Sequence, residues 1–115
     1  MHWQMLPAQW RTRPFRAMGC QMTVWLELGS AARAEPLLRE AEAMFARAER
    51  CLSRFDAASE LSQLNARPGV WTPVSGMLWQ VILQALFMAR ETGGLFDPTL
   101  LSALEAAGYD RSFEK

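Results

Sequence analysis

The alternation of apolar and polar side chains near the N-terminus predicts a half-buried β-strand. The segment runs from residue 15 to residue 28. One face carries Met22, Val24, Leu26 and Leu28, and the other carries Thr23, Trp25 and Glu27. A period of two is typical of a strand with one face on a core and the other in water. We therefore predict one strand here, ended by Gly29-Ser30.

Two long segments follow with helical periodicity. The first helix is predicted from the end of Gly29-Ser30 to about Phe55, with Pro36 tolerated only in its first turn. Its apolar positions are Leu37, Ala41, Met44, Phe45, Ala48, Cys51, Leu52 and Phe55. The second helix is predicted from Gly76 to Thr92, with Ser75 as its cap. Because it is apolar on most sides, we expect it at the centre of the core.

Shorter elements are predicted between and after these helices. Ser59 is a candidate N-cap for a helical turn in SELSQLN, and residues 70–74 are typical of a brief strand. Gly93 suits the left-handed position that ends a helix. A third helix is predicted over residues 98–108, with Asp97 as its N-cap.

The order of these elements is an α+β pattern, with an N-terminal strand and long amphipathic helices. Residues 1–14 show no periodicity and are predicted to form an irregular N-terminal arm, while residues 15–115 form one domain with a modest core. One or two strands do not make a stable sheet by themselves. We therefore expect the domain to be completed by a partner chain, by a second copy in a homo-oligomer, or by more of the same polypeptide.

The charge balance excludes several classes of partner. Twelve basic and twelve acidic residues give a formal net charge of zero, so no electrostatic footprint for nucleic acid is present. No apolar run approaches the length of a membrane span, and no export signal is recognised, so we expect a soluble, cytoplasmic protein. Cys20 and Cys51 lack the spacing of a metal knuckle, and a buried thiol is expected for Cys51.

The chain offers few groups for catalysis. Its one histidine, His2, lies in the N-terminal arm, which excludes Ser–His and Cys–His nucleophile systems in the folded part. The sequence shows neither a cluster of metal-ligating residues nor an obvious pair of carboxylates. We assign no catalytic residue and no metal ligand to this chain.

The segment GGLFDP, residues 93–98, is the best candidate for a binding site. Helix punctuation explains its first glycine, its Asp and its Pro, but not Gly94, Leu95 and Phe96. Two glycines before an apolar pair allow the backbone to approach a flat ligand closely. From the residues alone, helix punctuation is the favoured interpretation.

Four segments taken in order resemble one enzyme family. They are AMGCQMTVWL, LSRFDAASELSQLN, VSGMLWQVILQAL and TGGLFDPTLLSALEAAGYD. The FAD:protein FMN transferases, or ApbE family, show MGT before a strand, a helix ending in LSxY or LSxF, the string SxLSxxN and a GGxFD-type motif. From Phe15 to about Phe113 the chain resembles the N-terminal part of that family.

The resemblance implies a fold, a reaction and a set of ligands. The family has an α+β, tunnel-like (T-fold-like) architecture that holds FAD, so this chain would be a partial domain of that kind. With Mg²⁺, family members split the pyrophosphate of FAD, release AMP and attach FMN to a Ser or Thr of a target flavoprotein. The implied cofactors and partners are FAD as substrate, Mg²⁺ and an acceptor flavoprotein. Many relatives are exported lipoproteins.

By motif, the resemblance implies five FAD-binding positions in this sequence. Met18 would touch the dinucleotide, and Phe55 would pack on it as the family's aromatic residue does. Leu95, Phe96 and Asp97 would supply backbone and carboxylate contacts to a ring edge. Thioether and aromatic side chains suit a flat heteroaromatic face, and a carboxylate accepts from a ring N–H.

Two departures from the family pattern limit the expected activity. MGT is replaced by MGC, so Cys20 has a thiol in place of a hydroxyl. The family's HxxDPxTG-like segment and acidic metal ligands have no counterpart before Lys115. Because Mg²⁺ neutralises developing charge in phosphoryl transfer, we expect a truncated FAD-contacting fragment that is inactive by itself. A non-catalytic module that binds a flavin or a partner, and a purely structural helical domain, are the alternatives.

Overall fold

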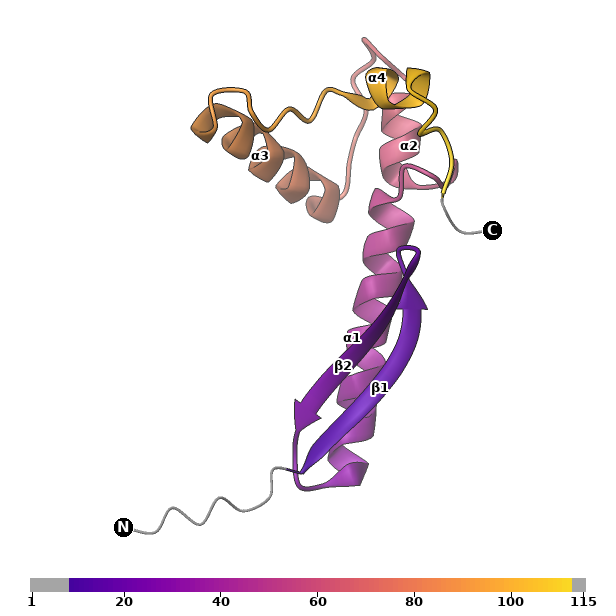
Figure 1. The fold of residues 1–115 in the computed structure, drawn as a ribbon, viewed down its shortest axis with the longest axis vertical. Helices are drawn as coiled ribbons and strands as arrows, with labels where there is room; N and C mark the ends of the chain where they lie inside the picture. The colour runs from indigo at the N-terminus through magenta and orange to yellow at the C-terminus, as the bar shows by residue number, and fades with distance from the viewer. Residues whose placement is uncertain (1–8, 113–115) are drawn as a thin grey trace. The chain divides into compact units, whose positions relative to one another are not determined.

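The computed structural model describes residues 9–112 (Figure 1). In chain order this part contains β1 (Trp10–Ala17), β2 (Cys20–Glu27), α1 (Ala31–Leu52), α2 (Glu60–Asn65), α3 (Gly76–Glu91) and α4 (Leu101–Ala106). This composition confirms the α+β class. The chain divides into two compact units, Met1–Arg47 and Ala48–Lys115, and the boundary falls within α1.

The first unit is built from a β-hairpin and the N-terminal part of α1. β1 and β2 pair antiparallel, with Ala17 opposite Cys20 at the closed end, and Met18 and Gly19 form the turn. Half-buried and exposed residues alternate along β2 as the hydrophobic pattern predicted. The face that includes Met22 is therefore the inner face of the hairpin.

The predicted irregular arm is wrong for residues 10–14, which belong to β1, and the single strand predicted over residues 15–28 is instead two strands joined by the turn at Met18 and Gly19. The inner face of β1 carries arginine as well as apolar side chains. Because of these charged residues, the sequence of β1 does not show the alternation of apolar and polar positions that is typical of a strand. Arg13 is neutralised by α1, since its guanidinium forms ion pairs with Glu42 and, at 3.3 Å, with Glu35. Residues 1–8 of the predicted arm lie outside the described residues.

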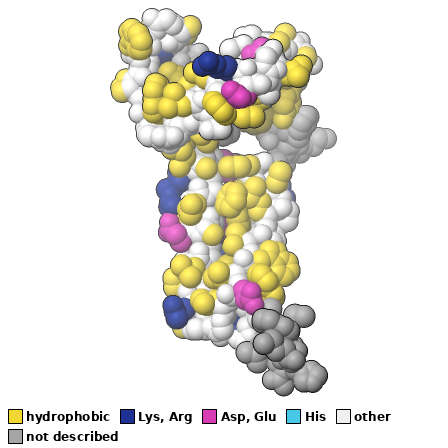
Figure 2. Space-filling view, turned by 90° about the vertical axis from the view of Figure 1, so that its left-hand side faces the viewer, with side chains coloured by type: hydrophobic (Ala, Val, Ile, Leu, Met, Phe, Trp, Pro, Cys, Tyr) yellow, Lys and Arg dark blue, Asp and Glu magenta, His cyan; other side chains and the backbone are white. Residues whose placement is uncertain are grey.

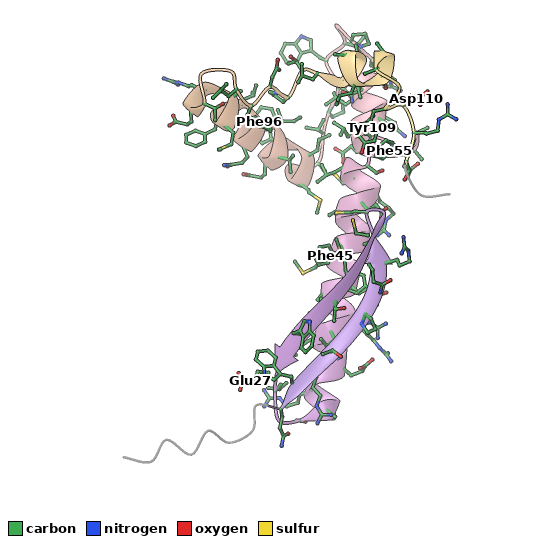
Figure 3. The ribbon with its side chains drawn as sticks, viewed as in Figure 1. Glu27, Phe45, Phe55, Phe96, Tyr109 and Asp110 are labelled. Carbon is green, nitrogen blue, oxygen red and sulfur yellow. The ribbon has the colours of Figure 1, made fainter. Side chains whose placement is uncertain are left out.

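Few side chains form the core of this unit. Phe15 of β1 is buried together with Ala34 and Leu38 of α1. The ring of Phe15 also packs against Phe45, with the centroids 5.5 Å apart and the rings tilted by 51° (Figure 3). The predicted apolar stripe is wrong at its start, where Leu37 is 54% exposed. Leu38 takes its place because it lies one helical turn after Ala34, on the same face.

α1 begins at Ala31, directly after Gly29-Ser30 as predicted, but its first turn does not reach Pro36. The backbone N–H of Arg33 donates to the hydroxyl of Ser30 at 3.3 Å, and the N–H of Ala34 donates to the Ser30 carbonyl at 3.0 Å. This cap starts the helix at Ala31, which places Pro36 in the second turn rather than the first. Proline has no N–H, so the carbonyl of Ala32 loses its helical hydrogen bond.

In the second unit, two serine caps lie where the sequence predicted them. Ser59 accepts the N–H of Ser62 at 3.1 Å before α2, and Ser75 accepts the N–H of Leu78 at 3.2 Å before α3. The brief strand predicted over residues 70–74 is wrong, because this segment is irregular. A strand needs a neighbour, and the sheet in the described part of the chain contains only β1 and β2.

The prediction that the second long helix, α3, lies at the centre of the core is also wrong for the chain as described. Leu78 is its one buried residue. The exposed large apolar side chains of α3 are Met77, Trp79, Val81, Leu83, Leu86, Phe87 and Met88. Figure 2 shows many hydrophobic side chains open on the face that it presents. The few short elements of this unit do not supply enough surface to cover α3.

Candidate functional site

The tip of the hairpin has an unusual backbone. Met18 and Gly19 both have positive φ angles, 54° and 69°. A two-residue turn of this kind matches the twist of the strands it joins, and it is normally occupied by Gly, Asn or Asp. Met18 is the one non-glycine residue in the described range 9–112 with a positive φ, a conformation that costs about 1–2 kcal/mol. The residue is 45% exposed, so the hairpin presents a strained methionine to solvent.

The end of α1 is fixed by a buried serine network. Ser59 is fully buried; its hydroxyl donates to the carbonyl of Ser53 and accepts the N–H of Ser62. The Ser62 hydroxyl donates to the same carbonyl at 3.2 Å. The network satisfies a carbonyl that a helix end leaves free. Both serines of the SxLSxxN string therefore have a structural role, which is to hold the segment that carries Phe55.

Phe55 belongs to a cluster with Arg54 and Tyr109 (Figure 3). The two rings approach edge to face, with their centroids 5.6 Å apart and the planes at 67°. The guanidinium carbon of Arg54 lies 4.2 Å from the Phe55 centroid and 4.3 Å from the Tyr109 centroid. Phe55 remains 41% exposed. Phe55 was predicted from its motif, whereas its two partners were not, because Tyr109 is 55 positions from Arg54 along the chain.

The end of α4 places Tyr109. Gly108 has a φ of 95°, and its N–H donates to the Glu105 carbonyl at 3.0 Å. The N–H of Tyr109 donates to the Leu104 carbonyl at 2.9 Å. These two bonds with a left-handed glycine form a Schellman motif. The motif sets the direction in which the chain leaves the helix, and with it the position of the Tyr109 ring.

The GGLFDP segment begins with the same motif at the end of α3. The Gly93 N–H donates to the Arg90 carbonyl at 3.1 Å, and the Gly94 N–H donates to the Ala89 carbonyl at 2.9 Å. The φ of Gly93 is 60°, which confirms the predicted helix end. Gly94 has a φ of 88°, so it too has a backbone role that the sequence analysis left open.

Thr92 ties the segment to α3. Its hydroxyl donates to the Met88 carbonyl at 2.8 Å and accepts the Phe96 N–H at 2.9 Å, while the Leu95 N–H donates to the Thr92 carbonyl at 3.2 Å. The side chains of Leu95 and Phe96 stay in water, 93% and 46% exposed. Thr92 is a positioning residue that the sequence analysis missed; a hydroxyl residue directly before two glycines was its signal.

Asp97 does not cap a helix, contrary to the prediction. α4 begins at Leu101 rather than at Pro98. The Asp97 Oδ1 accepts the Thr99 hydroxyl at 2.6 Å and the Thr99 N–H at 2.9 Å. This local turn satisfies the carboxylate without a helix, so the helix starts later. The Thr99 hydroxyl and then its N–H lower the pKa of the Asp97 carboxyl below its ordinary value.

Glu60 is a further carboxylate that the sequence analysis passed over. It accepts the backbone N–H of Ser75, and its Oε2 lies 3.5 Å from the Sγ of Cys51. The bond from the Ser75 N–H is the main reason that the pKa of Glu60 is lowered. Cys51, expected to be buried, is half-buried. This group joins the end of α1 to the start of α3, which is a structural role.

The described residues contain neither a cluster that could hold a metal ion nor a helix that could span a membrane. Between residues 9 and 112, no three or more His, Cys, Asp and Glu side chains gather in a way that could hold a metal ion. None of the helices in that range is long and apolar enough to cross a membrane. The Mg²⁺ that the resemblance implies therefore has no ligand set in this part of the chain.

The five predicted FAD-binding residues fall into three places. Met18 belongs to the first unit, while Phe55 and residues 95–97 belong to the second. Within the second unit, the hydrogen bonds and ring contacts of the described residues do not join Phe55 to residues 95–97. Figure 3 shows Phe96 beside α3 and away from the pair of Phe55 and Tyr109. Each place presents exposed apolar surface.

Comparison with protein families gives one match. The model of the ApbE family matches residues 18–115. The matched range includes all five of the predicted FAD-binding residues. Comparison with curated proteins gives no match.

The solved structures that are similar to this chain include two ApbE proteins. The crystal structure of the flavinyl transferase ApbE of Pseudomonas stutzeri, in its apo form, has a TM-score of 0.77 at 24% identity, over 87% of this chain and 33% of that one. The ApbE protein of Thermotoga maritima has a TM-score of 0.73 at 25% identity, over 92% of this chain and 34% of that one. The chain thus spans about a third of the length of these structures. Its α+β fold corresponds to part of an ApbE domain.

Proposed function

The chain belongs to the ApbE family, and on that basis we propose that it supplies the FAD-contacting part of an FAD:protein FMN transferase. The family match over residues 18–115 is the observation that carries the proposal. The similar Pseudomonas stutzeri protein is a flavinyl transferase, which supports the same class of activity.

In the proposed reaction, FMN moves from FAD to a Ser or Thr of a target flavoprotein, and AMP is released. Mg²⁺ supplies charge neutralisation in reactions of this type. Residues 9–112 offer no cluster of ligands for that ion. The role of the described residues is therefore to bind FAD and to orient it, and the acceptor protein and the metal ligands are expected outside them.

Two exposed side chains suit the flat rings of FAD. Met18 presents a thioether at the hairpin tip, and Phe55 presents a ring held by its neighbours. Both kinds of side chain form favourable contacts with aromatic faces. The positive φ of Met18 supports a role in binding, since backbone strain of this kind concentrates at ligand sites.

In the segment after α3, the open hydrogen-bond acceptors outnumber the open donors. The N–H groups of Leu95 and Phe96 are both engaged by Thr92. Their carbonyl oxygens and the Oδ2 of Asp97 remain to meet a ligand, because the Thr99 bonds go to Oδ1. Acceptors suit an amino or imino N–H at a ring edge, whereas a carboxylate repels pyrophosphate. We infer that residues 95–97 contact a ring edge of FAD.

A titration tests this binding role. FAD is added to the purified chain and to the variants Phe55→Leu and Asp97→Asn, and quenching of flavin fluorescence is followed. Saturable quenching is expected with the wild-type chain, and weaker binding with each variant. Glu105→Gln, which removes one carboxylate from the exposed surface of α4, is the matched control. No quenching by the wild-type chain contradicts the proposal. Equal losses of FAD affinity in Asp97→Asn and Glu105→Gln would show that Asp97 affects binding only through its charge and does not contact FAD.

A module that binds a flavin or a partner without transferring FMN is the second candidate. The apolar side chains exposed on α3 favour it, because large open apolar surfaces mark interaction sites. A chimera separates the two candidates: this chain is joined to the remaining two thirds of the Pseudomonas stutzeri enzyme and incubated with FAD, Mg²⁺ and an acceptor flavoprotein. Covalent flavin on the acceptor supports the transferase. A folded chimera that binds FAD without transfer supports the module.

A further inference from the structure

Arg54 lies against both rings of the cluster at the end of α1, the Phe55 and Tyr109 pair that Figure 3 labels. Its guanidinium carbon is at nearly equal distances, 4.2 Å and 4.3 Å, from the centroids of Phe55 and Tyr109. At such distances a cation is attracted to the negative face of an aromatic ring. One side chain therefore holds two rings, and these rings come from segments far apart in the sequence.

The position of this guanidinium is fixed further by a hydrogen bond. Its Nη2 donates to the Tyr109 carbonyl at 2.8 Å. The positive charge of Arg54 also helps to lower the pKa of Asp110, after the larger effect of the bond from Arg111. A planar guanidinium can lie over a ring face and donate along its edge at the same time, which an ammonium group does not do.

The arrangement determines which part of Phe55 is open to a ligand. The guanidinium covers one face of the ring, and the edge-to-face contact with Tyr109 restricts its tilt. The residue is still 41% exposed, so its free surface lies away from Arg54. A ring held in one orientation loses less conformational freedom when a flat ligand binds to it.

We propose that Arg54 is a positioning residue for FAD binding: it holds the Phe55 ring against Tyr109 so that the free face of Phe55 receives a flat aromatic ring of FAD. This role rests on the proposed function. Arg54 itself does not touch FAD, because its guanidinium lies against both rings and its Nη2 is used by the Tyr109 carbonyl.

The test uses the full chain and three variants. Arg54→Met removes the cation and keeps an unbranched side chain, Arg54→Lys keeps the charge, and Arg50→Met removes a cation from an exposed position in the last turn of the same helix. FAD affinity is measured by fluorescence quenching, and the visible circular dichroism of bound FAD is recorded at saturation. Thermal unfolding shows that each variant is folded. Tyr109 is the single tyrosine, so tyrosine-labelled protein gives one set of ring signals from the cluster by NMR.

Arg54→Met is expected to weaken FAD binding about tenfold, to change the flavin circular dichroism and to shift the Tyr109 ring signals. Arg54→Lys is expected to restore part of the affinity, and Arg50→Met to bind like the wild-type chain. A folded Arg54→Met variant with wild-type affinity overturns the proposal, as do equal losses in Arg54→Met and Arg50→Met. If Arg54→Met does not fold, wild-type affinity in Arg54→Lys overturns it, since lysine cannot bridge both rings.

The proposed function fails separately. If the wild-type chain does not bind FAD, the proposed function is wrong and the role of Arg54 in binding falls with it. If the wild-type chain binds FAD and Phe55→Leu weakens binding while Arg54→Met does not, the function stands and the role of Arg54 alone is overturned.

Discussion

The helices α3 and α4 end in the same backbone motif, yet the segments that follow them differ. After Gly93 the chain leaves Leu95 93% exposed, whereas after Gly108 it packs Tyr109 against Phe55. In both cases the left-handed glycine and its hydrogen bonds set the direction of the chain. The side chains that come next decide its use. One segment leaves its apolar side chains exposed, and the other packs its aromatic ring within the unit.

The largest expected effect is the loss of the packed side chain. Tyr109→Ala removes the edge-to-face contact and one of the two cation–π contacts, which together are worth about 2 kcal/mol. Urea unfolding followed by circular dichroism measures the loss. Tyr109→Phe keeps both ring contacts and is expected to retain most of the stability. A loss below about 0.5 kcal/mol in Tyr109→Ala would show that the segment after α4 is no more packed than the one after α3.

The next largest effect on stability is expected from substitution of Gly93 and Gly108, which end α3 and α4. A Cβ on Gly93 or Gly108 meets no atom within 4 Å, so alanine at either position costs only the strain of a positive φ, about 1–2 kcal/mol. Gly108→Ala is expected to cost more than Gly93→Ala, since the strain there also displaces Tyr109 from its partners. Gly76→Ala, with equal space and no positive φ, is the control without a loss. Equal costs at Gly93 and Gly108 would remove the distinction between the two helix ends.

Leu95→Ala gives a smaller effect on stability. Because the side chain is 93% exposed, the free energy of unfolding is expected to change by less than about 0.5 kcal/mol. FAD affinity is expected to fall, since this side chain belongs to the proposed binding segment. Chemical denaturation and FAD titration on the same sample give both values. A loss of stability comparable to that of Tyr109→Ala is the result that does not fit.

The smallest effect is electrostatic. The pKa of Asp97 is lowered by Thr99, and that of Asp110 mainly by the bond from Arg111. Each carboxylate therefore stabilises the folded state fully above the ordinary aspartate pKa of the unfolded chain, and this stabilisation is lost as the pH falls through the lowered folded value. The effect is small because both groups are exposed.

Thermal unfolding of the wild-type chain, Asp97→Asn and Asp110→Asn between about pH 6 and pH 2 measures these contributions as differences. The difference in melting temperature between the wild-type chain and each variant should disappear at the acid end of this range. A difference that stays constant with pH would show that the carboxylates do not stabilise the two segments by charge.

The parts of the fold that depend on local chemistry could be predicted. The caps at Ser59 and Ser75 and the end of α3 at Gly93 follow from hydrogen bonds that span a few residues. β1 was missed because Arg13 points inward, and its neutralisation by α1 is a contact between distant positions. The helix predicted at Asp97 failed for a local reason, since two different turns compete for the same carboxylate.

The candidate site was predicted only in outline. Phe55 and residues 95–97 came from motifs, and the structure adds how they are held. Arg54 and Thr92 could not be assigned these roles from the sequence, because an arginine before an aromatic residue and a threonine at a helix end are ordinary in that context. Their roles come from the three-dimensional positions of Tyr109 and the Phe96 N–H.

The positive φ of Met18 makes the hairpin tip a position where stability and binding oppose each other. Glycine adopts this backbone without steric strain, and the relief of about 1–2 kcal/mol exceeds its added entropic cost of about 0.5–1 kcal/mol, so Met18→Gly is expected to raise the melting temperature. The same change removes the thioether proposed to meet FAD. Laboratory evolution for heat resistance alone would favour glycine here, whereas evolution for flavin affinity would keep methionine. The residue found at position 18 after selection thus shows whether heat resistance or flavin affinity was selected.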